Sequence, residues 1–202
     1  IDKYAIKIAS TNYPDTIQLG DILNWRDWDI DWSNIGLLIG GSPCQGFSFA
    51  GKQLAFDDPR SKLFFTYCDI LNHIRKFNPD VKFLLENVRM KQVFQYVITD
   101  HLGVEPIPIN SAVLSALNRP RLYWGNFLDN YTPPQPTGLT IRDIMLPVTD
   151  ERLYLSPVAV ERLRKIRIRA EEKGYGYKPC IHGPDDKFLC LDASFFKGPD
   201  GK

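Results

Sequence analysis

Apolar residues follow two kinds of pattern along this chain. Residues 35–39 and 81–85 are short, nearly continuous apolar runs with the length and composition of buried strands. Between these runs, apolar residues recur at the spacing of one face of an amphipathic helix. The residues of that face are Leu63, Phe64, Tyr67, Leu71 and Ile74. The alternation of strand and helix predicts an α/β fold with a largely parallel sheet covered by helices.

Further elements follow from the same pattern and from turn residues. A short helix is predicted over residues 3–12, and a strand over residues 16–19. A second helix is predicted over residues 91–102, where Gly103 would end it, and a strand over residues 104–109. Together these elements extend the α/β alternation over the first half of the chain.

Three tryptophans, Trp25, Trp28 and Trp32, stand among aspartates in the segment before the first apolar run. Aromatic rings can stack on a nucleic-acid base, but acidic neighbours argue against a surface that faces phosphate. We therefore expect the three rings to be packing residues.

Composition indicates a globular protein. A chain of 202 residues suits one domain, or one domain and part of another, and a 44% apolar content with 12% aromatics is enough for a sizeable core. No apolar segment approaches the roughly 18 residues of a membrane span, so no membrane partner is expected. The net charge of +1 gives no global basic signature. A nucleic-acid partner must therefore be argued from local patches.

The four cysteines, Cys44, Cys68, Cys180 and Cys190, contain no C-x-x-C pair. Cys180 and Cys190 flank His182, but their spacing fits no standard zinc pattern and lacks a fourth ligand, so no metal is expected. A reduced, cytoplasmic setting fits these cysteines better than a disulfide framework.

Cys44 is the first candidate for chemistry. Two glycines, a serine and a proline (residues 40–43) lead from the first apolar run to this cysteine. In open α/β sheets, ligands and chemistry lie at the carboxyl ends of the strands. A nucleophile and a buried structural cysteine are both open interpretations, since a free cysteine often serves as a small apolar residue.

Glu86 follows the second apolar run as Cys44 follows the first. If the two strands are parallel, the carboxyl group would point into the same crevice as Cys44. Attack of a thiolate on carbon needs acid help elsewhere on the substrate, which a partly desolvated carboxyl group can give. The alternative roles of Glu86 are a surface carboxylate or a helix-capping partner.

Arg119 and Arg121 are the third candidate group. Side chains alternate along a strand, so two arginines two residues apart on an extended segment would point the same way. The planar guanidinium suits phosphate oxygens and the carbonyl acceptors of a base. A solvated basic edge strand is the alternative.

Taken in this order, the three stretches resemble the cytosine-5 DNA methyltransferase family. The segment around Cys44 is similar to its motif IV, residues 86–88 to motif VI, and residues 118–121 to motif VIII. Flanking segments agree: residues 2–5 resemble motif II, residues 20–22 motif III, and residues 63–65 the start of motif V. The sequence of residues 110–126 most resembles those of the phage and prophage enzymes of this family.

The resemblance implies a Rossmann-like S-adenosylmethionine-dependent methyltransferase sheet with helices on both faces. Residues 1–130 would form the catalytic domain, and residues 131–202 a linker and part of a smaller target-recognition region. Motif I and motifs IX and X have no counterpart here, so the chain is expected to be an internal fragment of a longer enzyme. Leu117 stands where motif VIII has glutamine, and it cannot make the polar contacts of that residue.

The resemblance also implies catalytic roles. Cys44 would add to C6 of a cytosine extruded from the duplex, and Glu86 would hydrogen-bond N3 and the exocyclic amine of that base. Arg121 would hold the base O2, with Arg119 ordering the catalytic loop and a nearby phosphate. The implied activity is methyl transfer from S-adenosylmethionine to C5 of cytosine in double-stranded DNA.

For the cofactor, the resemblance implies that Asp21 hydrogen-bonds the adenine amine while Ile22 and Ile1 pack on the two faces of the ring. Pro43 and Leu63 complete the expected S-adenosylmethionine site. On sequence alone, an aspartate in a turn after Gly20 is an equally open interpretation of Asp21. The expected DNA contacts are Gln45, Ser48, Arg60 and Asn87, and residues 49–60 would close over the extruded base.

The C-terminal part changes in composition. Prolines at 133, 134 and 136 mark a linker, and Ser156 before Pro157 predicts the start of a helix. This helix is basic on one side and has an apolar stripe formed by Val160, Leu163 and Ile166. A basic helix near a DNA groove would attract phosphates, and a solvated helix face is the alternative.

Other functions stay open. A tRNA cytosine-5 methyltransferase would use the same cysteine and glutamate, and a non-catalytic DNA-binding remnant would use neither. A cysteine hydrolase is disfavoured, because His73, His101 and His182 lie within a helix or near helix or loop ends rather than beside Cys44. No obligate protein partner is inferred.

Overall fold

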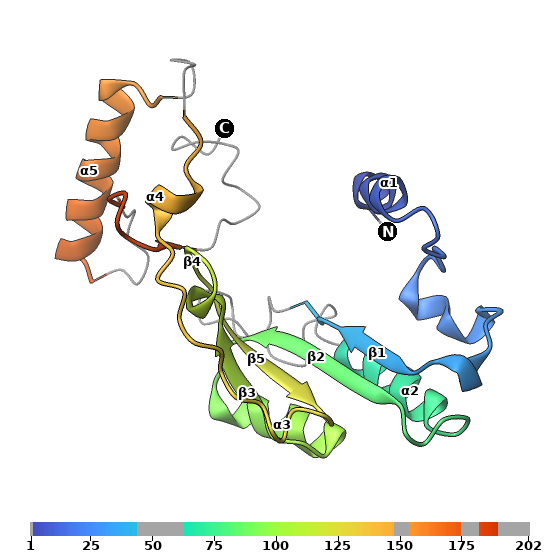
Figure 1. Cartoon of the computed structure of the whole chain (residues 1–202). Helices are drawn as coiled ribbons and strands as arrows, with labels where there is room; N and C mark the ends of the chain where they lie inside the picture. The colour runs from blue at the N-terminus through green and yellow to red at the C-terminus, as the bar shows by residue number, and fades with distance from the viewer. Residues whose placement is uncertain (1, 44–62, 148–153, 175–181, 190–202) are drawn as a thin grey trace. The chain divides into compact units, whose positions relative to one another are not determined.

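The computed structural model of the chain describes residues 2–43, 63–147, 154–174 and 182–189. The chain divides into two compact units, whose helices and strands are labelled in Figure 1. The first unit comprises Ile1–Ile109 and Arg121–Tyr131, and the second comprises Asn110–Pro120 and Thr132–Lys202. Within the described ranges, no helix has the length and apolar character needed to cross a membrane.

A four-stranded sheet with the order β1-β2-β5-β3 is the centre of the first unit. The strands are β1 (Leu37–Gly40), β2 (Lys82–Val88), β3 (Ile107–Asn110) and β5 (Pro120–Gly125). β1 and β2 are parallel, whereas β2 and β5 are antiparallel, so the prediction of a largely parallel sheet is wrong for the described strands. β5 follows β3 after residues 111–119, a segment shorter than the roughly dozen residues of a parallel crossover.

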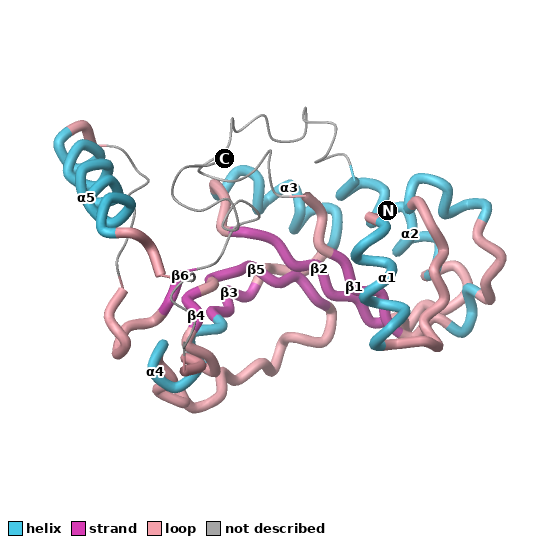
Figure 2. The backbone as a smooth tube through the Cα atoms, turned by 90° about the horizontal axis from the view of Figure 1, so that it is seen from above, coloured by secondary structure: helices cyan, strands magenta, loops and turns pink. Residues whose placement is uncertain are grey.

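Two helices, α2 (Leu63–Ile74) and α3 (Gln92–Leu102), cover one face of this sheet (Figure 2). The indole Nε1 of Trp124 on β5 donates to Oγ1 of Thr99 on α3 over 3.1 Å. Both predicted helices are confirmed, and Gly103 ends α3 with a left-handed φ of 74°. The most deeply buried core side chains are those of Phe64, Leu71, Ile74, Val81, Phe83, Leu85, Ile98 and Trp124.

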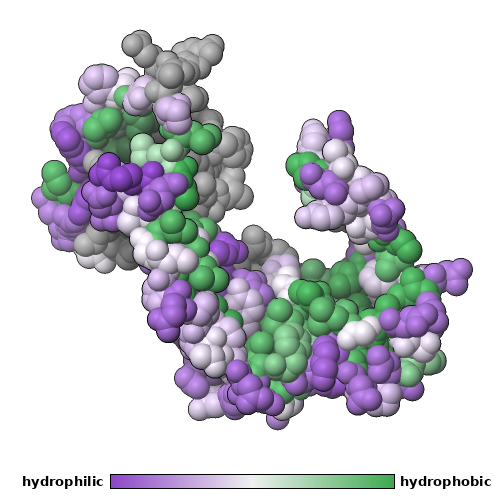
Figure 3. All heavy atoms as spheres, viewed as in Figure 1, coloured by the Kyte–Doolittle hydropathy of each residue, from purple (hydrophilic) through white to green (hydrophobic). Residues whose placement is uncertain are grey.

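The opposite face of the sheet is more open. On β1, Leu37 and Ile39 are 48% and 64% exposed, while Leu38 between them packs against the core. Figure 3 shows apolar side chains on this face, which is the one turned away from α2. The prediction that residues 35–39 form a fully buried strand is therefore wrong, because β1 is the edge strand of the described sheet. A helical layer on both faces is likewise not found among the described residues.

The segment before β1 contains α1 (Lys3–Asn12), as predicted. Asp2 caps this helix by accepting hydrogen bonds from the amides of Tyr4 and Ala5 at 2.8 and 2.9 Å. The strand predicted over residues 16–19 is not formed, and these residues are coil. A strand needs a partner for its backbone groups, and none of the described strands pairs with this segment.

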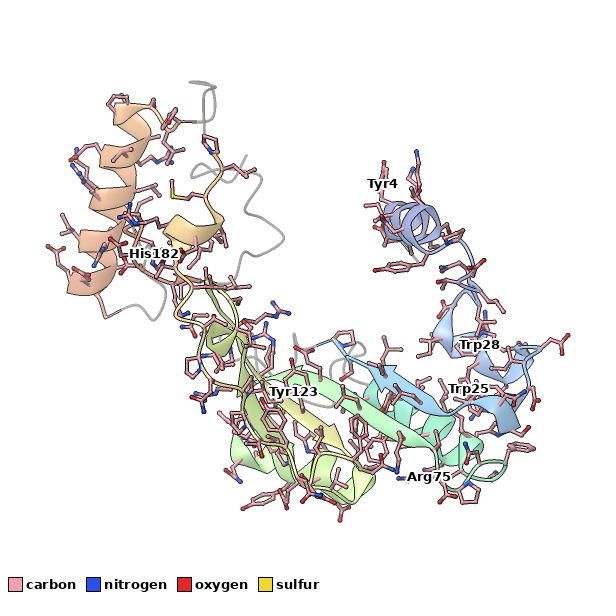
Figure 4. All side chains as sticks on the ribbon, in the orientation of Figure 1. Tyr4, Trp25, Trp28, Arg75, Tyr123 and His182 are labelled. Atoms are coloured by element: carbon pink, nitrogen blue, oxygen red, sulfur yellow. The ribbon has the colours of Figure 1, made fainter. Side chains whose placement is uncertain are left out.

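The three tryptophans pack as predicted. They lie in and between two short 3-10 helices, η1 (Ile22–Asp27) and η2 (Trp32–Asn34), and Figure 4 labels Trp25 and Trp28 there. The rings of Trp25 and Trp32 approach His73 of α2 edge-on, with centroid distances of 5.1 and 4.9 Å. The contacts attach the N-terminal segment to α2.

Asn126, just after β5, joins that strand to the beginning of β2. Its Oδ1 accepts a hydrogen bond from the amide of Phe83, and its Nδ2 donates to the carbonyl of Val81, both at 3.0 Å. The side-chain amide thus replaces two ladder hydrogen bonds at this end of the sheet.

The second unit is organised by short elements. Strands β4 (Leu117–Asn118) and β6 (Phe188–Leu189) form a parallel pair. They are accompanied by η4 (Ser111–Val113), α4 (Ile141–Ile144) and α5 (Pro157–Glu172). The predicted start of α5 is confirmed, since Ser156 Oγ accepts from the amide of Ala159 at 3.2 Å and Pro157 is the first helical residue.

Polar contacts connect these elements. Lys187 Nζ donates to the carbonyls of Ser115 and Leu139 at 2.9 and 2.8 Å. Arg142 forms a two-point pair with Asp185, at 2.8 and 2.9 Å. The assignment of residues 131–202 to target recognition stays a prediction.

Candidate functional site

The turn that follows β1 lies against the end of β2. In the parallel register Gly40 pairs with Leu85, so the next residues, Gly41 and Glu86, are neighbours. A Cβ atom placed on Gly41 would lie 3.4 Å from Glu86 Oε2. One placed on Gly40 would lie 2.6 Å from the ring of Tyr67, so this position has no room for a side chain. The two glycines let the chain leave β1 directly beside the Glu86 carboxylate.

Glu86 is paired with Arg121. The Nε of Arg121 lies 2.9 Å from Glu86 Oε1, and the side chains are 16% and 33% exposed for Arg121 and Glu86. The antiparallel register explains the contact, because Arg121 is opposite Val88 and Tyr123 is opposite Glu86, which puts all four on one face of the sheet. Charge-assisted hydrogen bonds of this kind are short and directional. The pair therefore presents an oriented carboxylate and guanidinium on the open face.

Asn87 points to the other face and is 1% exposed. Its Nδ2 lies 3.0 Å from Ser42 Oγ and 3.4 Å from the Ser42 carbonyl oxygen. Its Oδ1 accepts from the amide of Val88 at 2.8 Å. We expected Asn87 to contact DNA. In the structure its amide is instead occupied inside the protein, because a buried amide needs internal hydrogen-bond partners.

Arg119 lies in the break between β4 and β5 rather than on β5. Strand alternation therefore does not put Arg119 on the same face as Arg121, and the two residues belong to different units. Asn110 fixes the backbone of Arg119, since Asn110 Oδ1 accepts from its amide at 3.0 Å. The same oxygen accepts from Ala112, while Asn110 Nδ2 donates to Asn118 Oδ1 at 2.8 Å. Asn110 thus organises the loop that carries Arg119.

The residues expected to bind the cofactor lie on different elements of the first unit. Asp21 Oδ1 accepts from the amide of Leu23 at 3.0 Å as the cap of η1, and Gly20 before it has a left-handed φ of 81°. Ile22 is partly buried against the core. Pro43 and Leu63 are each half-buried, and Ile1 lies outside the described residues.

A shallow hollow lies next to Asp21 along the chain. It has a volume of about 510 Å³ and lies between α1 and the segment before η1. A carboxylate has more acceptor capacity than the single cap bond uses, so Asp21 can also accept from an amine. The residues that line the hollow are Asp2, Ala5, Ile6, Ala9, Gln18 and Gly20.

Several predicted site residues lie outside the described ranges. They are Cys44, Gln45, Ser48 and Arg60. Among the described residues, Cys68 is a buried free thiol, and burial raises its pKa to about 12, which makes it a poor nucleophile. No metal-binding cluster of histidine, cysteine or carboxylate side chains occurs in the part of the chain that the structure describes.

The basic helix α5 is partly neutralised by its own carboxylates. Arg167 pairs with Glu171 at 3.2 Å, and Glu161 lies 4.0 Å from both Arg164 and Lys165. These are exposed pairs of the kind that contributes little to stability. A phosphate contact by α5 stays a prediction.

Sequence reasoning assigned no role to Gly41 and Ser42 in the turn after β1, or to Tyr123 on β5. Tyr123 could have been found, because it is two residues from Arg121 and strand alternation puts both on one face. The contacts of Gly41 and Ser42 depend on the register between β1 and β2, and no local pattern in the sequence fixes a register between strands so far apart along the chain.

Residues 1–93 match the family model of the C-5 cytosine-specific DNA methylases. The Type II methyltransferase M1.ScrFI of Lactococcus lactis subsp. cremoris is 34% identical over 220 residues, which cover 98% of this chain and 54% of the relative. The Type II methyltransferase M.HpaII of Haemophilus parainfluenzae is 32% identical over 197 residues, which cover 87% of this chain and 54% of the relative.

A phage protein is also similar. The orphan methyltransferase M.Rho11sI of Bacillus phage rho11s is 42% identical over 94 residues, which are 44% of this chain and 17% of that protein. The chain spans about half the length of the first two relatives.

Proposed function

Because the chain belongs to the C-5 cytosine-specific DNA methylase family, we propose that it carries the catalytic residues for methylation of cytosine C5 in DNA, with S-adenosylmethionine as the methyl donor. The observation that supports this most is the junction of β1 and β2. There the turn leading to Cys44 passes Glu86, which is paired with Arg121 on an open face of the sheet.

The chemistry begins with the weak nucleophilicity of cytosine C5. A bond from the Cys44 sulfur to C6 turns the ring into an enamine-like nucleophile at C5. Glu86 would supply a proton at N3 as this bond forms, and Arg121 would hold the base O2. S-adenosylmethionine, when bound, supplies the methyl group. Loss of the C5 proton then restores the ring and breaks the bond to Cys44.

The base must leave the duplex for this reaction, because a thiolate cannot reach C6 inside the base stack. Residues Gln45, Ser48 and Arg60 are proposed to contact the nucleotide or its backbone, and Arg119 a nearby phosphate. Residues 131–202 are proposed to contribute to target recognition. Double-stranded DNA is the proposed partner.

The described residues suit the proposed cofactor in their chemistry. The Asp21 carboxylate would accept the adenine amine, and Ile22, Pro43 and Leu63 would offer apolar surface to the ring. Gly20, the residue before Asp21, lines the hollow along α1. Ile1 would add apolar surface on the other side of the ring.

Covalent trapping tests the proposal. Wild-type protein with S-adenosylmethionine should form a stable adduct with duplex DNA containing 5-fluorocytosine, because fluorine at C5 blocks the final elimination. Cys44→Ser should bind this DNA and form no adduct. An adduct that persists in Cys44→Ser would show that the nucleophile is another residue.

Glu86→Gln should lower turnover roughly 10²- to 10⁴-fold, the usual contribution of a general acid. Glu105→Gln is the matched control, since Glu105 is an exposed glutamate of the same unit. Equal turnover in the two variants would remove Glu86 from the proton role. Methyl transfer to tRNA in preference to duplex DNA would assign the chain to RNA.

A further inference from the structure

Among the described residues, Asn87 is the only buried one with a side-chain amide, carboxylate or cationic group. A buried amide lowers stability unless its donors and acceptor are hydrogen-bonded, so a single such group at a strand end calls for a physical explanation. Here the partners are specific: the hydroxyl and the carbonyl of Ser42 on one side, and the amide of Val88 on the other.

The position of these partners matters more than their number. Asn87 immediately follows Glu86, and Ser42 is two residues before Cys44. One side chain therefore joins the strand that carries the carboxylate to the turn that leads to the cysteine. Gly41 lies against Glu86 in the same turn, and Pro43, with its fixed φ, comes next. The turn is held at consecutive positions before the chain reaches Cys44.

We propose that Asn87 is a positioning residue that fixes the direction in which the chain leaves β1, and so the placement of the Cys44 thiol relative to Glu86. The inference rests on the proposed function for the identity of the nucleophile. An asparagine is required because the site needs a donor toward the Ser42 carbonyl and an acceptor for the Val88 amide. An aspartate keeps the acceptor and lacks the donor, and it places a charge against a carbonyl oxygen.

The decisive variant is Asn87→Asp, which has nearly the same shape. We expect its rate of adduct formation on 5-fluorocytosine DNA to fall about 10- to 100-fold at saturating DNA, because a displacement of about 1 Å can reduce a rate by that factor. The DNA concentration for half-maximal trapping should stay near the wild-type value. Ser42→Ala should give a smaller loss, since the carbonyl contact remains, and Ser42→Thr should retain the wild-type rate because it keeps the hydroxyl.

Asn126→Ala is the matched control. Asn126 is also an asparagine whose amide bonds two backbone groups, at the opposite end of β2. The Asn126→Ala protein should lose about as much stability as Asn87→Asp. Its folded molecules should trap DNA at the wild-type rate. Rates are normalised to the folded fraction, measured by circular dichroism. An equal loss of rate in Asn126→Ala would show that the effect is general destabilisation and would overturn the proposal.

A measurement without DNA separates this inference from the proposed function. The rate at which iodoacetamide alkylates Cys44, followed peptide by peptide as a function of pH, should differ between Asn87→Asp and wild type. It should be the same in Asn126→Ala and wild type. Identical curves for Asn87→Asp and wild type would overturn the positioning role. If wild type traps no DNA while the curves differ, the proposed function fails and the positioning role stands.

Discussion

The two units are stabilised by different means. The first contains a continuous apolar core in which Phe64, Phe83 and Trp124 are fully buried. In the described part of the second, the buried apolar side chains are those of Ala116 and Ala170. Its elements are connected instead by Lys187 and by the pair of Arg142 and Asp185. Large buried side chains hold a fixed geometry, whereas partly buried and exposed polar contacts are more accessible to water.

The difference matches what each unit is proposed to do. Placing a sulfur beside a carboxylate requires an accuracy that a packed core can supply. Adapting to a DNA surface requires less accurate placement of side chains. All four tryptophans of the chain, Trp25, Trp28, Trp32 and Trp124, are in the first unit, so their fluorescence reports on that unit alone.

The largest expected effect is on the first unit. Phe64→Ala should lower its free energy of unfolding by about 3–5 kcal/mol, because it leaves a cavity in the core beneath the sheet. Urea unfolding followed by tryptophan fluorescence measures this. Alkylation of Cys68, a thiol that burial protects, should begin at lower urea in the variant. An unchanged unfolding midpoint would contradict the role assigned to this core.

A smaller effect is expected from Lys187→Met in the second unit. The change removes two hydrogen bonds from a charged donor, each of a kind that contributes about 1.5–3 kcal/mol when both groups are shielded from water. Amide hydrogen exchange around Ala116 and Arg142 should speed up, while tryptophan fluorescence stays unchanged. Lys82→Met, at an exposed lysine of β2, is the control. A fluorescence change in Lys187→Met would show that the units are not independent.

Ser156→Ala should have a still smaller effect. It removes the hydroxyl that accepts from the Ala159 amide at the start of α5, which contributes about 1 kcal/mol in comparable helices. Exchange of the first amides of α5 should increase, and those near Ala170 should change little. Ser33→Ala applies the same test to the first unit, where Asp31 already caps η2 and a smaller change is expected.

The mildest perturbation is acid. Hydrogen bonds from the Thr140 backbone and hydroxyl hold the pKa of Asp143 below its ordinary value of 3.8, and the Arg142 guanidinium does the same for Asp185. Because the pKa of each carboxyl group is lower in the folded than in the unfolded chain, each carboxylate stabilises the fold at pH values above its unfolded-state pKa. This stabilisation is lost as the pH falls through the folded-state pKa. Hydrogen exchange at Ile141 and Arg142 should therefore rise below about pH 4, before fluorescence reports any change. Simultaneous changes would remove the distinction between the units.

Several elements of both units were predictable because they are locally encoded. The periodicity of α2, the glycine after α3 and the serine before α5 each act within a few residues, and all three predictions are confirmed. The family was predicted from short motifs and is supported by the comparisons. Glu86 was expected after the strand and lies within β2, which continues to Val88.

What could not be predicted depends on distant pairing. The exposure of β1, the antiparallel direction of β5 and the coil at residues 16–19 are all set by which strands lie next to one another. The side-chain pair of Glu86 and Arg121 has the same origin, since it joins residues 35 positions apart through the register of β2 and β5. Local sequence carries little information on register.

The chain passes between the units after Ile109, Pro120 and Tyr131. The second unit is therefore not a tail that can be removed by one cut. A protein ending at Tyr131 would keep the loop of Arg119. It would lose Lys187, which bonds the Ser115 carbonyl, and β6, which pairs with Ala116 and Leu117. Exchange of the C-terminal part between relatives would thus have to carry residues 110–120 along with it, or leave Arg119 on a loop that has lost its contacts to β6 and Lys187.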